Sequence, residues 1–191
     1  IKEALSEPEL IDFPGIGTLE SFNTDGLRTL AETLDVPTMR ERTMRYPGHI
    51  ALARAFRDTG LFSEEPVEVD GVQVVPRALL AKLLFPKWTF EPMEEDITVM
   101  RVVVEGELDG VPTRLKWDLL DRLDPVTGFT SMSRTTGFTC TVVARMMMDG
   151  TLKTPGVFAP EMIATEDGIL DAILAGLAER GVHYTAHMES Q

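Results

Sequence analysis

Two spacings of hydrophobic and polar residues alternate along the chain, and together they predict both strands and helices. Strand-like patterns occupy residues 18–22, 67–75, 97–107 and 111–123, with Asp-Gly turns inside or between them. Helical stripes of apolar residues follow positions 27, 50, 142 and 170, and a further helix is expected at 76–84. Strands joined by tight turns favour antiparallel pairing. We therefore expect an α+β fold with a largely antiparallel or mixed sheet and helices packed on one of its faces.

The junction between an expected strand at 38–44 and the helix that follows Pro47-Gly48 concentrates candidate chemistry. Arg45 lies beside this break, close to the expected N-terminus of a helix with Ile50, Ala53 and Phe56 on one face. Free backbone N–H groups at a helix N-terminus favour negative charge, and an arginine can hold a carboxylate through two parallel hydrogen bonds. Arg45 is therefore our candidate for binding a substrate carboxylate. The alternative is an arginine that is solvated or paired with a nearby acid.

Two other corners allow more than one interpretation. Residues 23–25 (Asn-Thr-Asp) suit the N-cap of the helix containing Leu27, and they also suit contact with a polar ligand. Residues 129–133 are expected to be extended, with Arg134 beginning a helix whose start would also suit an anion. His49 could carry a proton, but the sequence assigns it no partner acid or base.

Several residues have plainer interpretations. Cys140 is expected to be a buried small hydrophobe rather than a reactive thiolate, and the aromatic loop 85–90 is expected to anchor the core. Gly15 and Gly17 belong to a turn rather than to a phosphate-binding loop, which needs a third glycine and a following helix. His183 and His187 lie in an expected strand without further ligands, so no metal site is expected.

Composition and charge narrow the function. The chain has 191 residues, 43% of them hydrophobic, and a net charge of −13, which disfavours nucleic acid as a partner. A single cysteine fits a reducing compartment, and no apolar run is long enough to span a membrane, so we expect a cytoplasmic location. The chain begins with Ile1 and lacks a nucleotide-binding fingerprint. We therefore expect one domain, residues 1–191, from a longer protein.

Three segments together resemble the saccharopine dehydrogenase (saccharopine reductase-like) family. They are residues 19–27 (Leu-Glu-Ser-Phe-Asn-Thr-Asp-Gly-Leu), 43–49 (Thr-Met-Arg-Tyr-Pro-Gly-His) and 131–138 (Ser-Met-Ser-Arg-Thr-Thr-Gly-Phe). The resemblance covers most of the chain. It implies the C-terminal, substrate-binding and dimerising portion of such an enzyme, without the upstream dinucleotide-binding domain.

The resemblance also implies a reaction and a set of partners. The whole protein would be an oxidoreductase that uses NAD or NADP and acts on the C–N bond of an amino-acid-derived amine such as saccharopine or lysine. The chain alone would bind a small amino-acid-like substrate and form a homodimer, without turnover. Arg45 would hold a substrate carboxylate, with Thr24, Asp25 and Tyr46 as further substrate-binding candidates, while the catalytic acid and base stay unassigned. The alternative is a non-enzymatic interaction or dimerisation domain.

Overall fold

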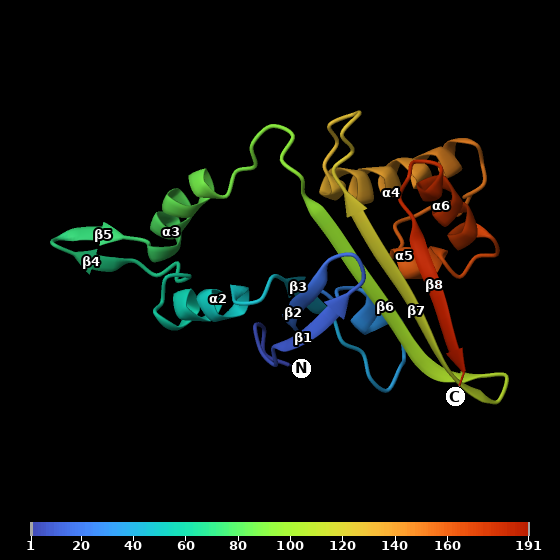
Figure 1. Cartoon of the computed structure of the whole chain (residues 1–191), viewed down its shortest axis with the longest axis horizontal. Coiled ribbons are helices and arrows are strands. Elements are labelled where there is room, and N and C mark those ends of the chain that lie inside the picture. The colour runs from blue at the N-terminus through green and yellow to red at the C-terminus, as the bar shows by residue number, and fades with distance from the viewer. Residues whose placement is uncertain (1, 191) are drawn as a thin grey trace. The chain divides into compact units, whose positions relative to one another are not determined.

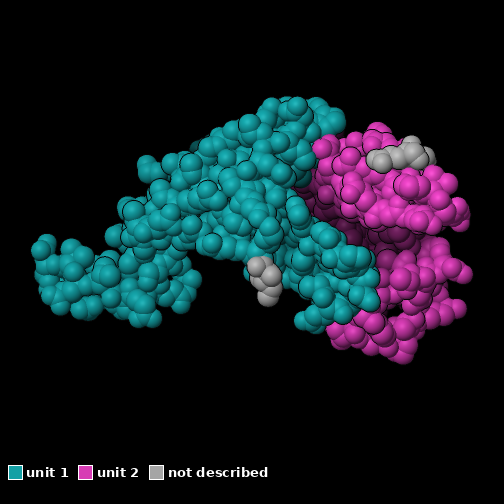
Figure 2. All heavy atoms as spheres, turned by 90° about the horizontal axis from the view of Figure 1, so that it is seen from below, with its two compact units in different colours: residues 1–91 teal, residues 92–191 magenta. Residues whose placement is uncertain are grey.

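The computed structural model describes residues 2–190, and the chain divides into two compact units, residues 1–91 and 92–191 (Figure 2). Within the described residues, helices accompany three antiparallel sheets, which confirms the expected α+β class. The single domain expected over residues 1–191 stays a prediction. Each unit is described separately below.

The first unit begins with a three-stranded antiparallel sheet. It consists of β1 (Glu9–Phe13), β2 (Gly17–Asn23) and β3 (Arg42–Arg45), with β2 in the centre. The turn at Pro14–Gly17 forms as expected, since the Ile16 N–H donates to the Phe13 carbonyl at 3.1 Å. The strand expected at 38–44 is shorter and begins only at Arg42. Arg42 pairs with Asn23, the last residue of β2, so no residue of β2 remains to pair with residues 38–41.

Two helices follow β2 and β3. The helix α2 (His49–Asp58) forms as expected after Gly48, whose φ of 97° is a left-handed conformation that glycine adopts without strain. The helix expected after residues 23–25 is much shorter than predicted and starts later. It is α1 (Leu30–Thr33), which has only four residues and Thr29 at its N-cap position. The chain between β2 and α1 instead turns through Arg28, which has a φ of 50°.

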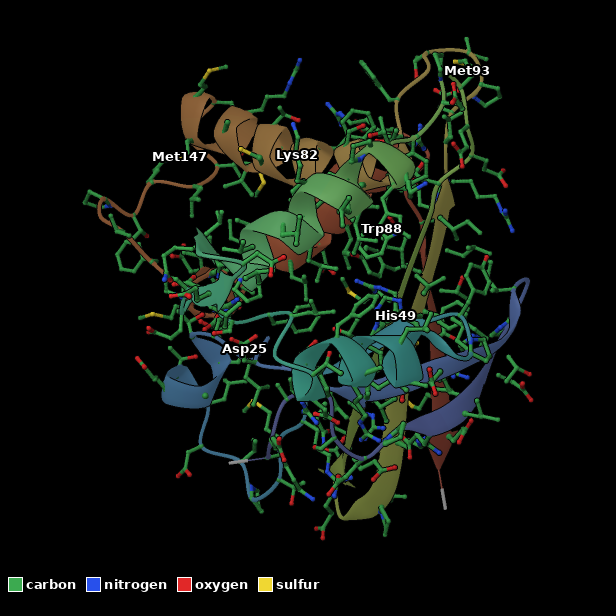
Figure 3. All side chains as sticks on the ribbon, turned by 90° about the vertical axis from the view of Figure 1, so that its left-hand side faces the viewer. Asp25, His49, Lys82, Trp88, Met93 and Met147 are labelled. Atoms are coloured by element: carbon green, nitrogen blue, oxygen red, sulfur yellow. The ribbon has the colours of Figure 1, made fainter. Side chains whose placement is uncertain are left out.

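The rest of the first unit is a segment that buries little surface. It contains the hairpin β4 (Val67–Val69) and β5 (Val72–Val74), then α3 (Pro76–Leu84) and the short 3-10 helix η1 (Phe85–Lys87). The hairpin and α3 confirm the expected elements. The core-anchoring role expected for loop 85–90 is wrong, because Trp88 and Phe90 are 64% and 58% exposed. Figure 3 shows Lys82 on α3 and Trp88 beyond its end.

The second unit is built on a long antiparallel sheet. Its strands are β6 (Ile97–Leu108), β7 (Val111–Arg122) and β8 (Tyr184–Ser190), with β7 in the centre (Figure 1). The hairpin expected between residues 97 and 123 is confirmed. Three helices separate β7 from β8: α4 (Ser131–Met148), the short α5 (Pro160–Ile163) and α6 (Ile169–Ala178).

Helices α4 and α6 pack together and cover one end of this sheet. One core cluster joins Val142 and Met146 of α4 to Leu152 and Ile169. A second joins Leu119 of β7 to residues on and after α6, namely Leu177 and Val182. Gly176 allows the two helices to approach closely, because a Cβ atom there would lie 2.8 Å from Cγ1 of Val142.

The start of α4 differs from the expected one by a helical turn. Residues 131–133 are helical rather than extended, and the N-cap residue is Thr130, whose hydroxyl accepts a hydrogen bond from the Ser133 N–H at 3.2 Å. Asp96, distant in sequence, accepts bonds from the Ser131 and Met132 N–H groups at 2.6 and 2.9 Å. Cys140 is exposed, so the expectation that it is buried is wrong.

Candidate functional site

Arg45 lies at the end of β3, immediately before the turn into α2. Arg45 is exposed, and its Nη1 donates to the carbonyl of Met44 at 2.8 Å. Within residues 2–190, no carboxylate forms an ion pair with Arg45. The guanidinium therefore keeps most of its donors available to a ligand carboxylate, as the sequence-based hypothesis requires.

The helix N-terminus beside Arg45 is not free, which corrects part of that hypothesis. Oε2 of Glu20 accepts hydrogen bonds from the backbone N–H groups of Gly48 and Ile50 at 3.2 and 3.1 Å. A carboxylate from β2 therefore already satisfies the first donors of α2. A substrate carboxylate would be bound by Arg45 from one side rather than also by the helix.

Other arginines of the first unit are occupied inside the fold. The side chain of Arg42 is 16% exposed, pairs with Glu9 at 3.3 Å and donates to Ser21 Oγ at 2.9 Å. Nε of Arg54 donates to the Leu5 carbonyl at 2.9 Å, and Arg57 pairs with Glu3 and Asp58. These contacts fix the N-terminal segment to the sheet and to α2. Arg42, Arg54 and Arg57 are therefore structural residues.

Thr24 and Asp25 lie at the opposite end of the β2–β3 pair from Arg45. Arg45 is opposite Glu20, and Thr24 follows the last paired residue of β2, Asn23. Four residues along a strand span about 13 Å, so one small carboxylate cannot contact Arg45 and Thr24 together. Figure 3 agrees, since the labelled Asp25 lies well away from His49, the first residue of α2.

Neither Thr24 nor Asp25 acts as a helix cap, and each has a local partner instead. The Thr24 hydroxyl donates to the carboxylate of Glu41 and lies 3.0 Å from the Thr43 hydroxyl. Asp25 is exposed and forms a long ion pair with Arg28 at 4.0 Å. The prediction that they cap a helix is therefore wrong, and the prediction that they contact the substrate stays a prediction.

Tyr46 and His49 border Arg45. The Tyr46 ring is 63% exposed, and its carbonyl accepts from the His49 N–H at 3.3 Å. The His49 ring stacks against Phe22, with centroids 6.2 Å apart and planes 11° from parallel. Partial burial there, and then the cation of Arg45, lower the pKa of His49 below its ordinary value of 6.5, while Glu20 opposes the change. The protonation of the His49 imidazole therefore depends on the charges of Arg45 and Glu20.

Arg134, the other arginine expected at an anion site, is buried in the second unit. Its Nε donates to Oδ2 of Asp121 at 3.0 Å, its Nη1 approaches Asp124 at 3.5 Å, and its Nη2 donates to the Arg180 carbonyl at 3.3 Å. Its guanidinium also lies 5.7 Å from the centroid of the Phe138 ring. These contacts use the donors of Arg134, so the anion-binding interpretation of this helix start is wrong.

The sequence analysis missed two carboxylates that shape these corners, Glu20 and Asp96. Each reaches a helix N-terminus from a segment distant in sequence, 28 residues away for Glu20 and Gly48 and 35 for Asp96 and Ser131. Each is one acid among many in the chain, and no local pattern marks its helix partner. Only the pairing of β2 with β3 could have placed Glu20 beside the start of α2.

The described residues do not fit a dinucleotide or a metal. Gly15 and Gly17 form the tight turn between β1 and β2, and no helix follows that could receive a pyrophosphate. Residues 2–190 contain no group of three or more histidine, cysteine or acidic side chains arranged to hold a metal ion. Across the same residues, no helix is long and apolar enough to cross a membrane.

Comparison with known proteins places the chain among oxidoreductase domains. The family described as "Saccharopine dehydrogenase C-terminal domain" matches residues 2–182, and the chain belongs to this family. A relative from Schizosaccharomyces pombe (strain 972 / ATCC 24843), saccharopine dehydrogenase (NADP(+), L-glutamate-forming), is 31% identical over 124 residues. That match covers 64% of this chain and 26% of the relative. The resemblance seen in the three sequence segments is thereby confirmed.

Proposed function

We propose that the chain is the substrate-binding and dimerising part of an NAD(P)-dependent oxidoreductase that acts on the C–N bond of an amino-acid-derived amine. Saccharopine, lysine or a related amine would be the substrate. Membership of the saccharopine dehydrogenase C-terminal domain family and the activity named for the fission yeast relative support this proposal. A cytoplasmic location is part of it.

The observation that carries the proposal is the state of Arg45. It is exposed, and among residues 2–190 it forms no ion pair, although 31 acidic residues are present in the chain. The neighbouring carboxylate of Glu20 is held at the N-terminus of α2 instead. An amino-acid-like substrate carries a carboxylate of the geometry that a guanidinium binds bidentately. Arg45 would hold and orient that group.

The proposed reaction needs a cofactor that the described residues do not bind. NAD or NADP would supply hydride transfer at the C–N carbon, and the described residues do not fit a dinucleotide. We assign its binding to another part of the polypeptide. The catalytic acid and base belong there as well, and Thr24, Asp25 and Tyr46 remain secondary candidates for substrate contact.

The experiment compares equilibrium binding of saccharopine, glutamate and lysine to the wild-type chain, Arg45→Ala, Arg45→Lys and Arg40→Ala. Loss of a charge-assisted bidentate contact costs about 1.5–3 kcal/mol, so Arg45→Ala should weaken binding by about 10- to 150-fold. Arg45→Lys should recover only part of the affinity, because lysine cannot form the fork. Arg40, an exposed arginine five residues earlier, is the matched control and should have little effect.

The second candidate function is a non-enzymatic interaction domain. It is favoured by the many exposed apolar side chains, among them Leu79, Leu83, Phe85 and Trp88 in the segment around α3. On this alternative, none of the amines binds, and Arg45→Ala changes nothing. In the whole polypeptide, the oxidoreductase proposal instead requires turnover with NAD or NADP, and a KM that rises more than kcat falls when Arg45 is replaced.

A further inference from the structure

The second unit has a groove of about 340 Å³ along one side of α4. Four of the residues that line it are spaced four apart on the helix and therefore share a face: Ser133, Gly137, Thr141 and Arg145. Two phenylalanines and a second arginine complete the lining. The volume lies in the lower part of the range of small-molecule sites, about 300–1,000 Å³. The groove is therefore large enough for a small ligand.

The groove is cationic, although the chain as a whole has a net charge of −13. Arg145 and Arg180 line it, and none of the described residues that line it is acidic. Arg145 is exposed, and its guanidinium forms no hydrogen bond or ion pair with residues 2–190. Nη1 of Arg180 donates to the Gly176 carbonyl, and its ion pair with the exposed Glu179 is long, at 3.7 Å. Two arginines without an acid beside them in the lining favour an anionic ligand.

Two phenylalanine rings form an apolar wall of the groove. Phe129 and Phe138 meet edge to face, with ring centroids 6.4 Å apart and planes at 73°. Phe138 packs on the core around Leu119, and the Arg134 guanidinium lies 5.7 Å from its ring centroid. Phe129 is 52% exposed. The fold thus holds one ring in place, and an aromatic ligand can add a third ring to the edge-to-face pair.

Gly137 leaves the helix bare inside the groove. Glycine is less favourable than alanine in a helix interior, so its presence there calls for a reason. Packing gives none, because a Cβ atom on Gly137 would meet nothing within 4 Å, whereas one on Gly176 would lie 2.8 Å from Cγ1 of Val142. A glycine also allows a ligand to approach the backbone closely. Gly137 therefore suits the place where a flat ring would lie.

The two hydroxyl groups of the groove can accept hydrogen bonds. Ser133 Oγ already donates to the Thr130 carbonyl at 2.8 Å, and Thr141 Oγ1 donates to the Phe138 carbonyl at 3.1 Å. Each hydroxyl has one proton and two lone pairs, so its oxygen can still accept from a ligand N–H or O–H. The groove thus combines cations for a carboxylate, rings for a ring and acceptors for a donor.

We propose that this groove binds a small aromatic carboxylate that also carries an N–H or O–H donor, such as an aromatic amino acid or hydroxy acid. The groove belongs to the second unit and Arg45 to the first, so the proposal does not rest on the role of Arg45. Arg145 binds the carboxylate, the ring lies over Gly137 beside Phe138, and the donor contacts Thr141. From Gly137 to Arg145 the helix rises about 12 Å. A long side chain on a helix points back toward the N-terminus, which brings the guanidinium within reach of such a ligand.

The test is an NMR titration of the isotope-labelled chain with phenyllactate, which has the ring, the carboxylate and a hydroxyl donor. Phenylpropionate lacks the hydroxyl, and phenylethanol lacks the carboxylate. Phenyllactate should shift the amide signals of Gly137, Phe138 and Thr141. Phenylethanol should bind at least about 10-fold more weakly because it leaves the arginines without an anion, and phenylpropionate should lie between the two.

Variants on α4 then assign the contacts. Arg145→Ala should weaken phenyllactate binding by about 10-fold or more. Gly137→Leu fills the groove where no neighbour opposes a side chain, and should weaken binding by at least about 20-fold. Thr136→Leu and Lys153→Ala are the matched controls, because they change exposed residues outside the lining and should alter the affinity by less than about 2-fold. Circular dichroism verifies that each variant folds.

Three results would overturn the proposal. The first is the absence of any shift at Gly137 at the highest soluble concentration of phenyllactate. The second is equal binding of phenylethanol and phenyllactate, or an affinity that Arg145→Ala leaves unchanged. The third is binding that Arg45→Ala abolishes, which would assign phenyllactate to the substrate site. Because Arg45→Ala should leave this groove unaffected, the two proposals can fail independently.

Discussion

Glu20 and Arg45 lie directly opposite each other on β2 and β3, yet no ion pair joins these two residues. Cross-strand neighbours of opposite charge usually attract each other. Here the Glu20 carboxylate is held 3.2 Å from the Gly48 N and 3.1 Å from the Ile50 N, at the N-terminus of α2. The same acid therefore fixes the helix beside the candidate site and leaves the arginine available.

Replacing Glu20 should separate these two effects. Glu20→Gln keeps an oxygen near the helix but removes the charge, so we expect the free energy of unfolding to fall by about 1 kcal/mol. A negative charge near Arg45 also disappears, so a ligand carboxylate should bind a few-fold more tightly. Denaturant unfolding and calorimetric titration measure the two changes. The exposed Glu32→Gln is the control, and weaker carboxylate binding by Glu20→Gln would contradict this account.

His49 should make carboxylate binding depend on pH. Partial burial and the Arg45 cation hold its pKa below 6.5 in the free chain. Stability from this residue is thus present above about pH 6.5 and decreases as the pH falls, because the unfolded chain takes up the proton first. A carboxylate bound at Arg45 would favour the imidazolium, so affinity should rise as the pH falls through the pKa of His49. Titrations between pH 8 and 5 should show this slope, and an equal slope in His49→Asn would refute the role of His49.

Asp96 should stabilise the second unit as the acceptor at the start of α4. Burial opposes its ionisation, but hydrogen bonds from Met132 and Ser131 outweigh burial and hold its pKa below the ordinary 3.8. Its contribution is therefore present above about pH 4 and is lost as the pH falls through the lowered pKa. Asp96→Asn should reduce the unfolding free energy by about 2 kcal/mol near neutral pH. The exposed Asp167→Asn is the control, and equal losses in the two variants would argue against a specific role.

Two helical glycines should respond oppositely to alanine. A Cβ on Gly176 would lie 2.8 and 3.0 Å from the Cγ atoms of buried Val142, whereas a Cβ on Gly137 meets nothing within 4 Å. Gly137→Ala should therefore stabilise the chain by up to about 1 kcal/mol through helix propensity. Overpacking should outweigh that gain in Gly176→Ala, for a net loss of about 1 kcal/mol. Thermal unfolding with equal shifts in both variants would show that the helices can separate without penalty.

Most of the fold follows from local patterns. The long hairpin of β6 and β7 was predictable because apolar residues alternate on both sides of an Asp-Gly turn. The helix after Leu27 was not, because its apolar stripe finds no surface to bury against and only Leu30–Thr33 remain helical. The start of α4 was displaced for another reason: its capping carboxylate, Asp96, lies before β6. Such partners depend on tertiary structure rather than on spacing.

The candidate site was predictable to a smaller degree. The exposure of Arg45 beside the start of α2 agrees with the hypothesis drawn from residues 43–49. The separation of Arg45 from Thr24 did not follow from sequence, because it depends on the register of β2 and β3. Whether Arg134 bound a ligand or an internal acid was likewise undetermined, since a buried partner such as Asp121 is set by the packing of α4 on β7.

Because Arg134 is buried, the motif at residues 131–138 indicates the fold rather than a binding site. Residues 131–138 help to identify the family, yet the guanidinium of Arg134 donates its hydrogen bonds to Asp121, Asp124 and the Arg180 carbonyl. A relative could keep this motif, fold in the same way and still lack a functional binding site. Conversely, a relative that kept Arg45 but lost Arg134 would lack the buried ion pair between α4 and Asp121 of β7. On the role proposed for Arg45, residues 43–49 would therefore indicate substrate binding in a relative, whereas the motif at 131–138 indicates only the architecture of the second unit.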